Sequence, residues 1–238
     1  MCCVVHDHLS SARGIVALRI KICGITNEAD GQSVAELGGD AIGLNFYEKS
    51  PRFVDGATAQ AITSNLPPFV EPVGVFVNGL PERVLQELEN LKEIRTVQWH
   101  GARPRASALP GYRLIPVFSV SEADDVAEIE KYLVDCRSSG QVPSAVMVDA
   151  RVAGQYGGTG KTIPWPLLAD FRPDIPLILA GGLTPDNVAE AVRIVRPYGV
   201  DVASGVESSP GLKDRAKVSR FIANAREAAE KYIGPSRN

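Results

Sequence analysis

Residues 176–195, PLILAGGLTPDNVAEAVRIV, read as one complete strand-turn-helix unit. The apolar run PLILA (176–180) has the length of a buried strand, and the two glycines after it indicate a turn. Thr184 is a suitable N-cap for a helix whose first residue is Pro185. Apolar residues at the helical period then predict one buried helix face, made of Val188, Ala191, Val192 and Val195.

The same kind of unit recurs along the whole chain. Eight apolar runs have strand length: IVALRIKI (15–22), AIGLNF (41–46), PVGVFV (72–77), TVQW (96–99), LIPVF (114–118), AVMVD (145–149), PLILA (176–180) and VDVA (200–203). Most segments between them have helical periodicity, and Ser121 before Glu122 marks another helix start like that at Thr184. The weakest helix is expected in ARPRASALPG (102–111), which offers barely two turns.

Repeats of roughly 26 residues without a Pro/Gly/Ser-rich linker predict an α/β protein with one domain, a (β/α)8 TIM barrel over residues 15–234. An open doubly wound sheet is the alternative, but it usually uses fewer strands. Residues 235–238 are left as a C-terminal tail. Residues 1–14 lack the basic start and long apolar run of a signal peptide, so a disordered extension is expected there. Its Cys2, Cys3, His6 and His8 would hold a metal only if the segment folded.

Composition excludes several classes of protein. Of the 238 residues, 45% are hydrophobic and 22% charged, which is typical of a globular chain, and no stretch approaches the roughly 18 apolar residues of a membrane span. The net charge of −3 does not indicate the clustered positive charge that a nucleic-acid-binding surface needs. Four cysteines, two of them adjacent, form neither a disulfide framework nor a paired zinc motif. We therefore expect a cytoplasmic protein with no nucleic-acid partner, no membrane partner and no bound metal.

Functional groups of such a barrel lie at the C-terminal ends of the strands. Cys23 follows the first run and Asp149 ends the sixth. Alternation along the first strand places Lys21 and Cys23 on the inward face, with Ile20 and Ile22 facing the helices. The same alternation points Asp149 inward on its own strand. Both side chains are therefore expected at the mouth of the barrel, where Cys23 is either an inert buried thiol or a reactive one.

Two glycine-containing loops indicate an anion site. LAGGL (179–183) and ASGVE (203–207) place small residues between a strand and a helix, where backbone N–H groups can approach a phosphate. These loops follow the seventh and eighth strands, where phosphate sites of such barrels tend to lie. A phosphorylated small-molecule substrate is expected. The segment YGGTGKT (156–162) lacks the Walker spacing and is predicted to be a mobile lid beside Asp149.

Several motifs, taken together and in order, resemble those of the phosphoribosylanthranilate isomerase family. They run from about residue 19 to the last helix: KICGIT (21–26), GLNFYEKSPRFV (43–54), VGVFVN (73–78), VQWHG (97–101), VDA (148–150) followed by GGTGKTIPW (157–165), LAGGLTPDNV (179–188) and VDVASGVESSPGLKD (200–214). Two features depart from the family pattern. Trp99 stands where the family usually has leucine, which leaves the packing of that strand open, and residues 1–14 precede the usual start.

The resemblance implies an Amadori rearrangement of N-(5-phosphoribosyl)anthranilate to 1-(2-carboxyphenylamino)-1-deoxyribulose 5-phosphate, in tryptophan biosynthesis, without metal or organic cofactor. It implies that Cys23 is the general base and Asp149 the general acid, and that Arg52 holds the anthranilate carboxylate. It also implies phosphate binding near the loop residues Gly182, Ser204 and Gly205. The assembly is expected to be a monomer or a homodimer.

The residues leave some roles open. His100 either binds the substrate or satisfies a loop carbonyl, and Lys21 is either the cation that favours a Cys23 thiolate or a packed partner of a buried carboxylate. Asp201 is either a supporting group or a buried polar anchor. One rival function is another phosphate-binding barrel enzyme, which would need Lys and Glu, or Glu and Asp, at the strand ends. The other is a non-catalytic sugar-phosphate binder, which would not need Cys23 or Asp149.

Overall fold

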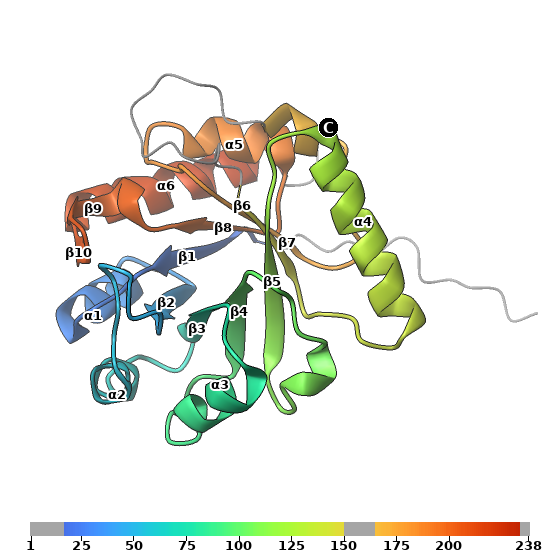
Figure 1. The fold of residues 1–238 in the computed structure, drawn as a ribbon. Coiled ribbons are helices and arrows are strands. Elements are labelled where there is room, and N and C mark those ends of the chain that lie inside the picture. Colours follow the sequence, from blue (N-terminus) through green and yellow to red (C-terminus); the bar gives the residue numbers. More distant parts are fainter. Residues whose placement is uncertain (1–16, 150–164, 234–238) are drawn as a thin grey trace, which may run out of the picture.

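The computed structural model describes residues 17–149 and 165–233, and these form a closed barrel of eight parallel strands in sequential order (Figure 1). Its strands are β1 (Arg19–Cys23), β2 (Ala41–Asn45), β3 (Glu71–Val77), β4 (Thr96–His100), β5 (Arg113–Ser119), β6 (Val146–Asp149), β7 (Leu177–Ala180) and β8 (Gly199–Val202). The barrel closes because β1 pairs with both β2 and β8. The predicted fold is confirmed.

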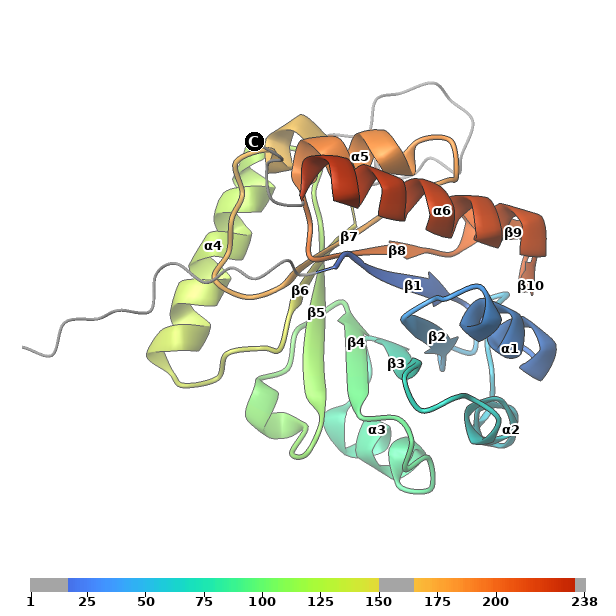
Figure 2. The same ribbon diagram turned by 180° about the vertical axis from the view of Figure 1, so that it is seen from behind.

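Helices surround the barrel on its outside (Figures 1 and 2). They are α1 (Glu28–Glu36), α2 (Gly56–Ser64), α3 (Pro81–Leu88), α4 (Ala123–Ser138), α5 (Val188–Val195) and α6 (Arg215–Tyr232). The weak helix expected after β4 is only a 3-10 turn, η1 (Ala106–Ala108), and a second such turn, η2 (Trp165–Leu168), precedes β7. Between β8 and α6 lie the 3-10 turn η3 (Ser204–Val206) and a small hairpin, β9 (Glu207–Ser209) and β10 (Leu212–Lys213).

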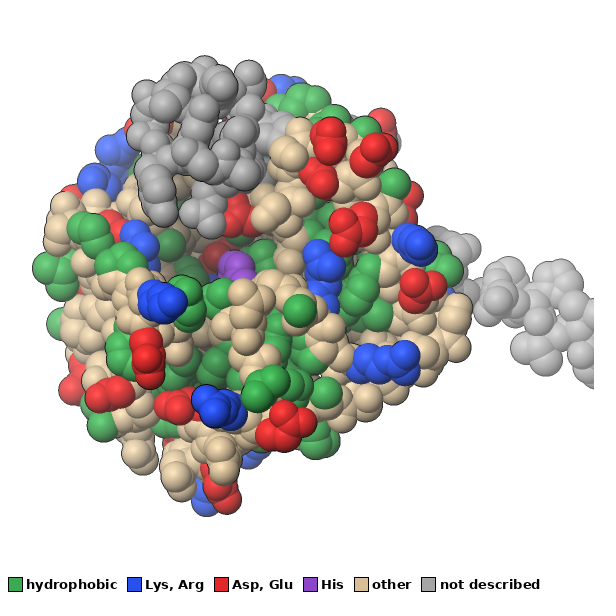
Figure 3. Space-filling view, viewed as in Figure 1, with side chains coloured by type: hydrophobic (Ala, Val, Ile, Leu, Met, Phe, Trp, Pro, Cys, Tyr) green, Lys and Arg blue, Asp and Glu red, His purple; other side chains and the backbone are tan. Residues whose placement is uncertain are grey.

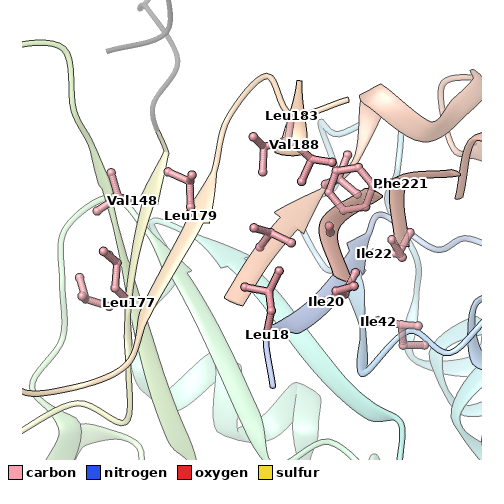
Figure 4. Close-up of a cluster of buried hydrophobic side chains, with 14 of the residues drawn as sticks. Leu18, Ile20, Ile22, Ile42, Val148, Leu177, Leu179, Leu183, Val188 and Phe221 are labelled. Atoms are coloured by element: carbon pink, nitrogen blue, oxygen red, sulfur yellow. The ribbon is translucent and has the colours of Figure 1, made fainter. Parts of the chain in front are cut away.

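The main apolar core lies between the strands and the helices (Figure 4). Ile20 and Ile22 of β1 are fully buried there, in the same cluster as Phe221 of α6. The expected alternation of β1 is therefore confirmed, since Lys21 points the other way and bonds within the barrel. Trp99, whose packing the sequence left open, is buried in the same core: it is 1% exposed, and its indole Nε1 donates to the carbonyl of Ala102 over 2.8 Å.

Two predicted helix starts are wrong by one or more residues. The helix expected from Pro185 begins at Val188, because the side chain of Asn187 accepts from the N–H of Thr184 (2.8 Å) and donates to the carbonyl of Gly182 (2.9 Å). These bonds hold the intervening residues in a turn. At α4 the cap is Glu122 rather than the serine before it, since Glu122 and Asp125 form a reciprocal capping box.

Some predictions fall on residues outside the described ranges. These are the disordered extension over 1–14 with its cysteines and histidines, the lid over 156–162 and the tail over 235–238. In the two ranges that the structure describes, no helix is both long and apolar enough to cross a membrane.

Candidate active site at the mouth of the barrel

A cavity opens where the C-terminal ends of the strands meet the loops that follow them. Figure 3 shows a hollow near the centre of this face, with a histidine and acidic side chains at its edge. Six of the seven residues predicted for the site line this cavity: Cys23, Arg52, His100, Asp149, Gly182 and Ser204. The fold therefore brings together most of the residues that the sequence predicted to act on one substrate.

Cys23 lies beside a buried ion pair inside the barrel. The ammonium of Lys21 donates to Asp201 over 2.8 Å, and the side chains are 7% and 8% exposed. The pair follows from the register, because Lys21 on β1 stands opposite Asp201 on β8 and both face inward. Lys21 thus has a partner carboxylate and also lies close enough to Cys23 to influence the pKa of its thiol.

Charge and burial act on the Cys23 thiol in opposite directions. Burial raises its pKa above the ordinary value, and the carboxylate of Asp201 acts in the same sense. The ammonium groups of Lys21 and Lys213 oppose this by favouring the thiolate. Lys21 itself keeps a raised pKa despite its burial, since Asp201 and Cys23 both favour its charged form. The charged form of the lysine is therefore favoured beside the thiol.

Gly43 of β2 provides the space that this arrangement needs. A Cβ atom at residue 43 would lie 2.6 Å from Cys23 Sγ, 3.0 Å from Cys23 Cα and 2.9 Å from Lys21 Nζ. Real Cβ atoms essentially never show contacts below 3.0 Å, so any side chain there would displace the thiol or the ammonium.

Gly43→Ala is accordingly expected to lower kcat by at least about 10-fold, at a stability cost of about 1–3 kcal/mol from overpacking. Steady-state kinetics and thermal unfolding measure the two effects separately. The matched control is Gly140→Ala, because a Cβ there meets nothing within 4 Å, although its positive φ of 65° adds some backbone strain. Equal kinetics in the two variants would show that Gly43 has no bearing on the thiol.

Arg52 is held in a charged cluster that the sequence analysis missed. Its Nε and Nη2 atoms donate to the two oxygens of Glu207 over 2.7 and 2.5 Å, and Lys213 Nζ donates to Oε1 of the same carboxylate over 2.8 Å. Burial alone would raise the pKa of Glu207, but the two cations hold it below its usual value. Burial lowers the pKa of Lys213, with Glu207 opposing that shift.

Asp149 and His100 stand on the wall that faces Cys23. Asp149 ends β6, is 8% exposed and pairs in register with Ala180 of β7. His100 ends β4, where its Nε2 lies 2.9 Å from the amide nitrogen of Gln98. The second atom of that amide, Gln98 Oε1, is buried without a hydrogen-bond partner among the described residues. Gln98 lines the cavity too; it was not among the predicted site residues, although alternation along β4 places it on the same face as His100.

The loops after β7 and β8 approach each other closely. A Cβ atom at Gly205 would lie 1.9 Å from the carbonyl oxygen of Leu183, so only glycine fits between the loops. Gly205 itself does not line the cavity, whereas its neighbour Ser204 and Gly182 of the other loop do. Gly182 has a φ of 63°, in the left-handed region that glycine adopts readily. The close approach gathers both loops at one rim of the mouth.

Within residues 17–149 and 165–233, no group of three or more histidine, cysteine, aspartate or glutamate side chains is arranged to hold a metal ion. The two cysteines in those ranges, Cys23 and Cys136, are free thiols.

Comparison with known proteins points to one family. The model of the N-(5′-phosphoribosyl)anthranilate isomerase family matches residues 20–224. An N-(5′-phosphoribosyl)anthranilate isomerase from Magnetococcus marinus is 42% identical over 216 residues, covering 90% of this chain and 98% of that protein. The crystal structure of phosphoribosylanthranilate isomerase from Thermotoga maritima superposes with a TM-score of 0.78 at 39% identity, covering 88% of this chain and 99% of that one.

A further structure shows a protein of this kind with a ligand. It is a phosphoribosylanthranilate isomerase in complex with reduced 1-(o-carboxyphenylamino)-1-deoxyribulose 5-phosphate. It superposes with a TM-score of 0.75 at 36% identity, and the alignment covers 88% of this chain and 99% of that one.

Proposed function

The chain belongs to the N-(5′-phosphoribosyl)anthranilate isomerase family, and on that premise we propose which of its residues carry out the reaction. The enzyme catalyses the Amadori rearrangement of N-(5-phosphoribosyl)anthranilate in tryptophan biosynthesis. The observation that carries the residue assignment is that Cys23 and Asp149 line one cavity from well-separated strands. Strands β1 and β6 are separated by β7 and β8 on one side of the barrel, so the two groups reach the substrate from different walls.

The first step requires an acid. Asp149 donates a proton to the ribose ring oxygen, the bond from that oxygen to C1′ breaks, and the anthranilate nitrogen supplies the electron pair that forms the protonated Schiff base. A carboxyl group at the end of a buried strand suits this task, because β6 fixes its position while the cavity leaves it 8% exposed. The ring-opened sugar then lies extended across the mouth.

The second step requires a base. The Cys23 thiolate removes the proton from C2′, and the electron pair of that C–H bond moves into the C1′–C2′ bond and neutralises the iminium nitrogen. The product is an enolamine, which becomes the amino ketone when C1′ takes up a proton and the C2′ hydroxyl loses one. A neighbouring cation increases the thiolate fraction, and Lys21 is placed to supply it.

Two anionic groups of the substrate need partners at the rim of the cavity. We assign the anthranilate carboxylate to Arg52, since the guanidinium fork matches a planar carboxylate and Arg52 lines the cavity. The phosphate is assigned to the gathered loops after β7 and β8, where Gly182 and Ser204 line the cavity and Gly205 allows the two loops to meet. His100 is assigned to substrate binding from the wall between these groups.

Turnover of the substrate by purified protein tests this function. N-(5-phosphoribosyl)anthranilate is fluorescent as an anthranilate derivative, so conversion is followed directly, and rescue of a tryptophan auxotroph that lacks the isomerase tests substrate and activity together. A sugar-phosphate binder without catalytic function would bind the product analogue and give no turnover. Another phosphate-binding barrel enzyme would fail to rescue the auxotroph.

Lys21→Met is expected to reduce kcat/KM at pH 7 by about 10-fold or more, because a smaller fraction of Cys23 is then thiolate. The thiolate is the active form, so kcat/KM rises with pH through the pKa of Cys23 in the free enzyme. Without the Lys21 cation that pKa moves higher, since burial and Asp201 still raise it and one of the ammonium groups that lower it is gone. The pH profile therefore shifts to higher pH and recovers in alkaline buffer.

The control for this variant is Lys131→Met, which removes an exposed ammonium from α4. Circular dichroism checks the fold, because breaking a buried ion pair leaves Asp201 uncompensated. A Lys21→Met enzyme with an unshifted pH profile would show that the lysine only packs against Asp201.

The compartment and the assembly of the enzyme are two further proposals. Free thiols are kept reduced in the cytosol, which supports our proposal of a cytoplasmic enzyme. We propose an assembly that is a monomer or a homodimer, and analytical ultracentrifugation at assay concentration distinguishes the two.

A further inference from the structure

The carboxylate of Glu207 is fixed by more bonds than a simple ion pair provides. Its Oε1 accepts from Arg52 Nε (2.7 Å), from Lys213 Nζ (2.8 Å) and from the N–H of Gly211 (3.3 Å), while Oε2 accepts from Arg52 Nη2 (2.5 Å). The Glu207 side chain is 5% exposed and that of Lys213 is 2% exposed. Because both oxygens are engaged from several directions, the carboxylate has one orientation.

The hairpin that carries Glu207 is itself anchored to the barrel. Thr26 Oγ1 donates to the carbonyl of Gly211 over 2.6 Å, and the N–H of Lys213 donates to Asp30 over 2.9 Å. Both anchors belong to the segment that follows β1, three and seven residues after Cys23 along the chain. Glu207 is therefore held in a fixed place relative to the proposed base.

Arg52 lies between this anchor and the cavity. A Cβ atom at Gly24 would meet Arg52 Cδ at 2.4 Å, so the arginine side chain passes directly over the backbone next to Cys23. It remains 21% exposed and lines the cavity. A guanidinium is planar, and two bonds along its Nε and Nη2 edge fix both the plane and the direction of the whole group.

We propose that Glu207 is a positioning residue: by clamping one edge of Arg52, it orients the guanidinium for the aromatic carboxylate of the substrate and so determines selectivity for carboxylated substrates. This proposal rests on the proposed function of Arg52. Preorganisation explains why it matters, since an unclamped arginine would lose rotamer freedom each time that it bound the substrate. The clamp removes that cost before binding.

Charge alone would predict the opposite effect. Glu207 carries a negative charge between two cations, so its removal makes the mouth more positive and would strengthen the binding of any anion. If orientation is what counts, removal weakens the binding of the carboxylate although the positive charge increases. The sign of the change in affinity therefore separates the two models.

The test is Glu207→Gln, which keeps the shape of the side chain and replaces one acceptor oxygen by an NH2 group that faces a donor. Two unreactive probes are titrated into each protein: the reduced form of the product, with its ortho-carboxylate, and the same compound without that carboxylate. We expect the Kd of the carboxylated probe and the KM of the substrate to rise by about 10-fold or more, in line with a lost charged hydrogen bond. The Kd of the probe without the carboxylate should stay within about 2-fold of wild type.

The control is Glu190→Gln, because Glu190 makes the same two-bond contact with Arg193 (2.8 and 2.5 Å) on the exposed surface of α5. This control should leave the Kd of both probes unchanged. A second variant, Glu207→Asp, keeps the buried charge beside Lys213 but shortens the reach to Arg52 by one methylene. We expect it to weaken the binding of the carboxylated probe only, and it replaces Glu207→Gln if that protein does not fold.

Three results would overturn the proposal. Tighter binding of the carboxylated probe to the Glu207 variant would show that Glu207 acts only through charge. Equally weaker binding of both probes would show a purely structural role, and unchanged affinities for both would show no role. A wild-type enzyme that binds both probes but does not convert N-(5-phosphoribosyl)anthranilate would contradict the proposed function instead, and the comparison of the probes would still stand.

Discussion

Replacing Cys23 by alanine is expected to lower kcat by at least about 100-fold while the barrel stays folded. The thiol lies at the end of β1 and faces the cavity, so the variant removes the only atom of the residue that can take a proton from C2′. The strand keeps its neighbours, because β1 is held by its pairing with β2 and β8 and by the buried Ile20 and Ile22. The loss should therefore appear in turnover and not in thermal stability.

The measurement is the change in fluorescence of the substrate, under single-turnover conditions, beside a thermal melt of the same sample. Cys136→Ala is the matched control, since Cys136 is a free, partly buried thiol on α4, outside the barrel mouth. It should keep near wild-type turnover. Similar turnover in both cysteine variants would leave Cys23 as an inert buried thiol, the alternative that its sequence left open.

The parts of this site that depend on local pattern could be predicted from the sequence. The inward direction of Cys23 and Asp149 follows from strand alternation, which holds once the strands are identified. The grouping of these residues follows from the barrel, because parallel strands bring their C-terminal ends to one face. The predicted helix start at Pro185 was wrong, because the observed start at Val188 depends on bonds made by a single side chain, Asn187, rather than on periodicity.

The parts that depend on register and distant contacts could not be predicted in the same way. Lys21 was expected on the inward face of its strand, and Asp201 as a supporting group or a buried polar anchor, but their pairing requires the neighbouring positions of β1 and β8. Glu207 and Arg52 are 155 positions apart, and no spacing rule relates two loops that meet across a barrel. Such contacts are made by the tertiary fold, so the sequence indicated the substrate-facing groups and missed those that hold them.

Asp149→Asn is expected to lower kcat by at least about 100-fold, with little change in KM, because the amide keeps the shape and hydrogen bonding of the carboxyl group but transfers no proton. Thermal stability should stay close to that of Asp174→Asn, a control that changes an exposed carboxylate paired with Arg137. That control should retain wild-type turnover.

An isotope effect separates the role of Asp149 from that of Cys23. If Asp149 opens the ring, its loss makes that step limiting, and deuterium at C2′ then slows turnover less than it does in the wild-type enzyme. If Cys23 removes the C2′ proton, its loss makes that step limiting, and the deuterium effect stays large or grows. An Asp149→Asn enzyme with an increased deuterium effect would place the aspartate at C2′ deprotonation and reverse the two assignments. Such a reversal would be hard to reconcile with the buried Lys21 ammonium beside Cys23, since a cation there favours the thiolate that a base requires.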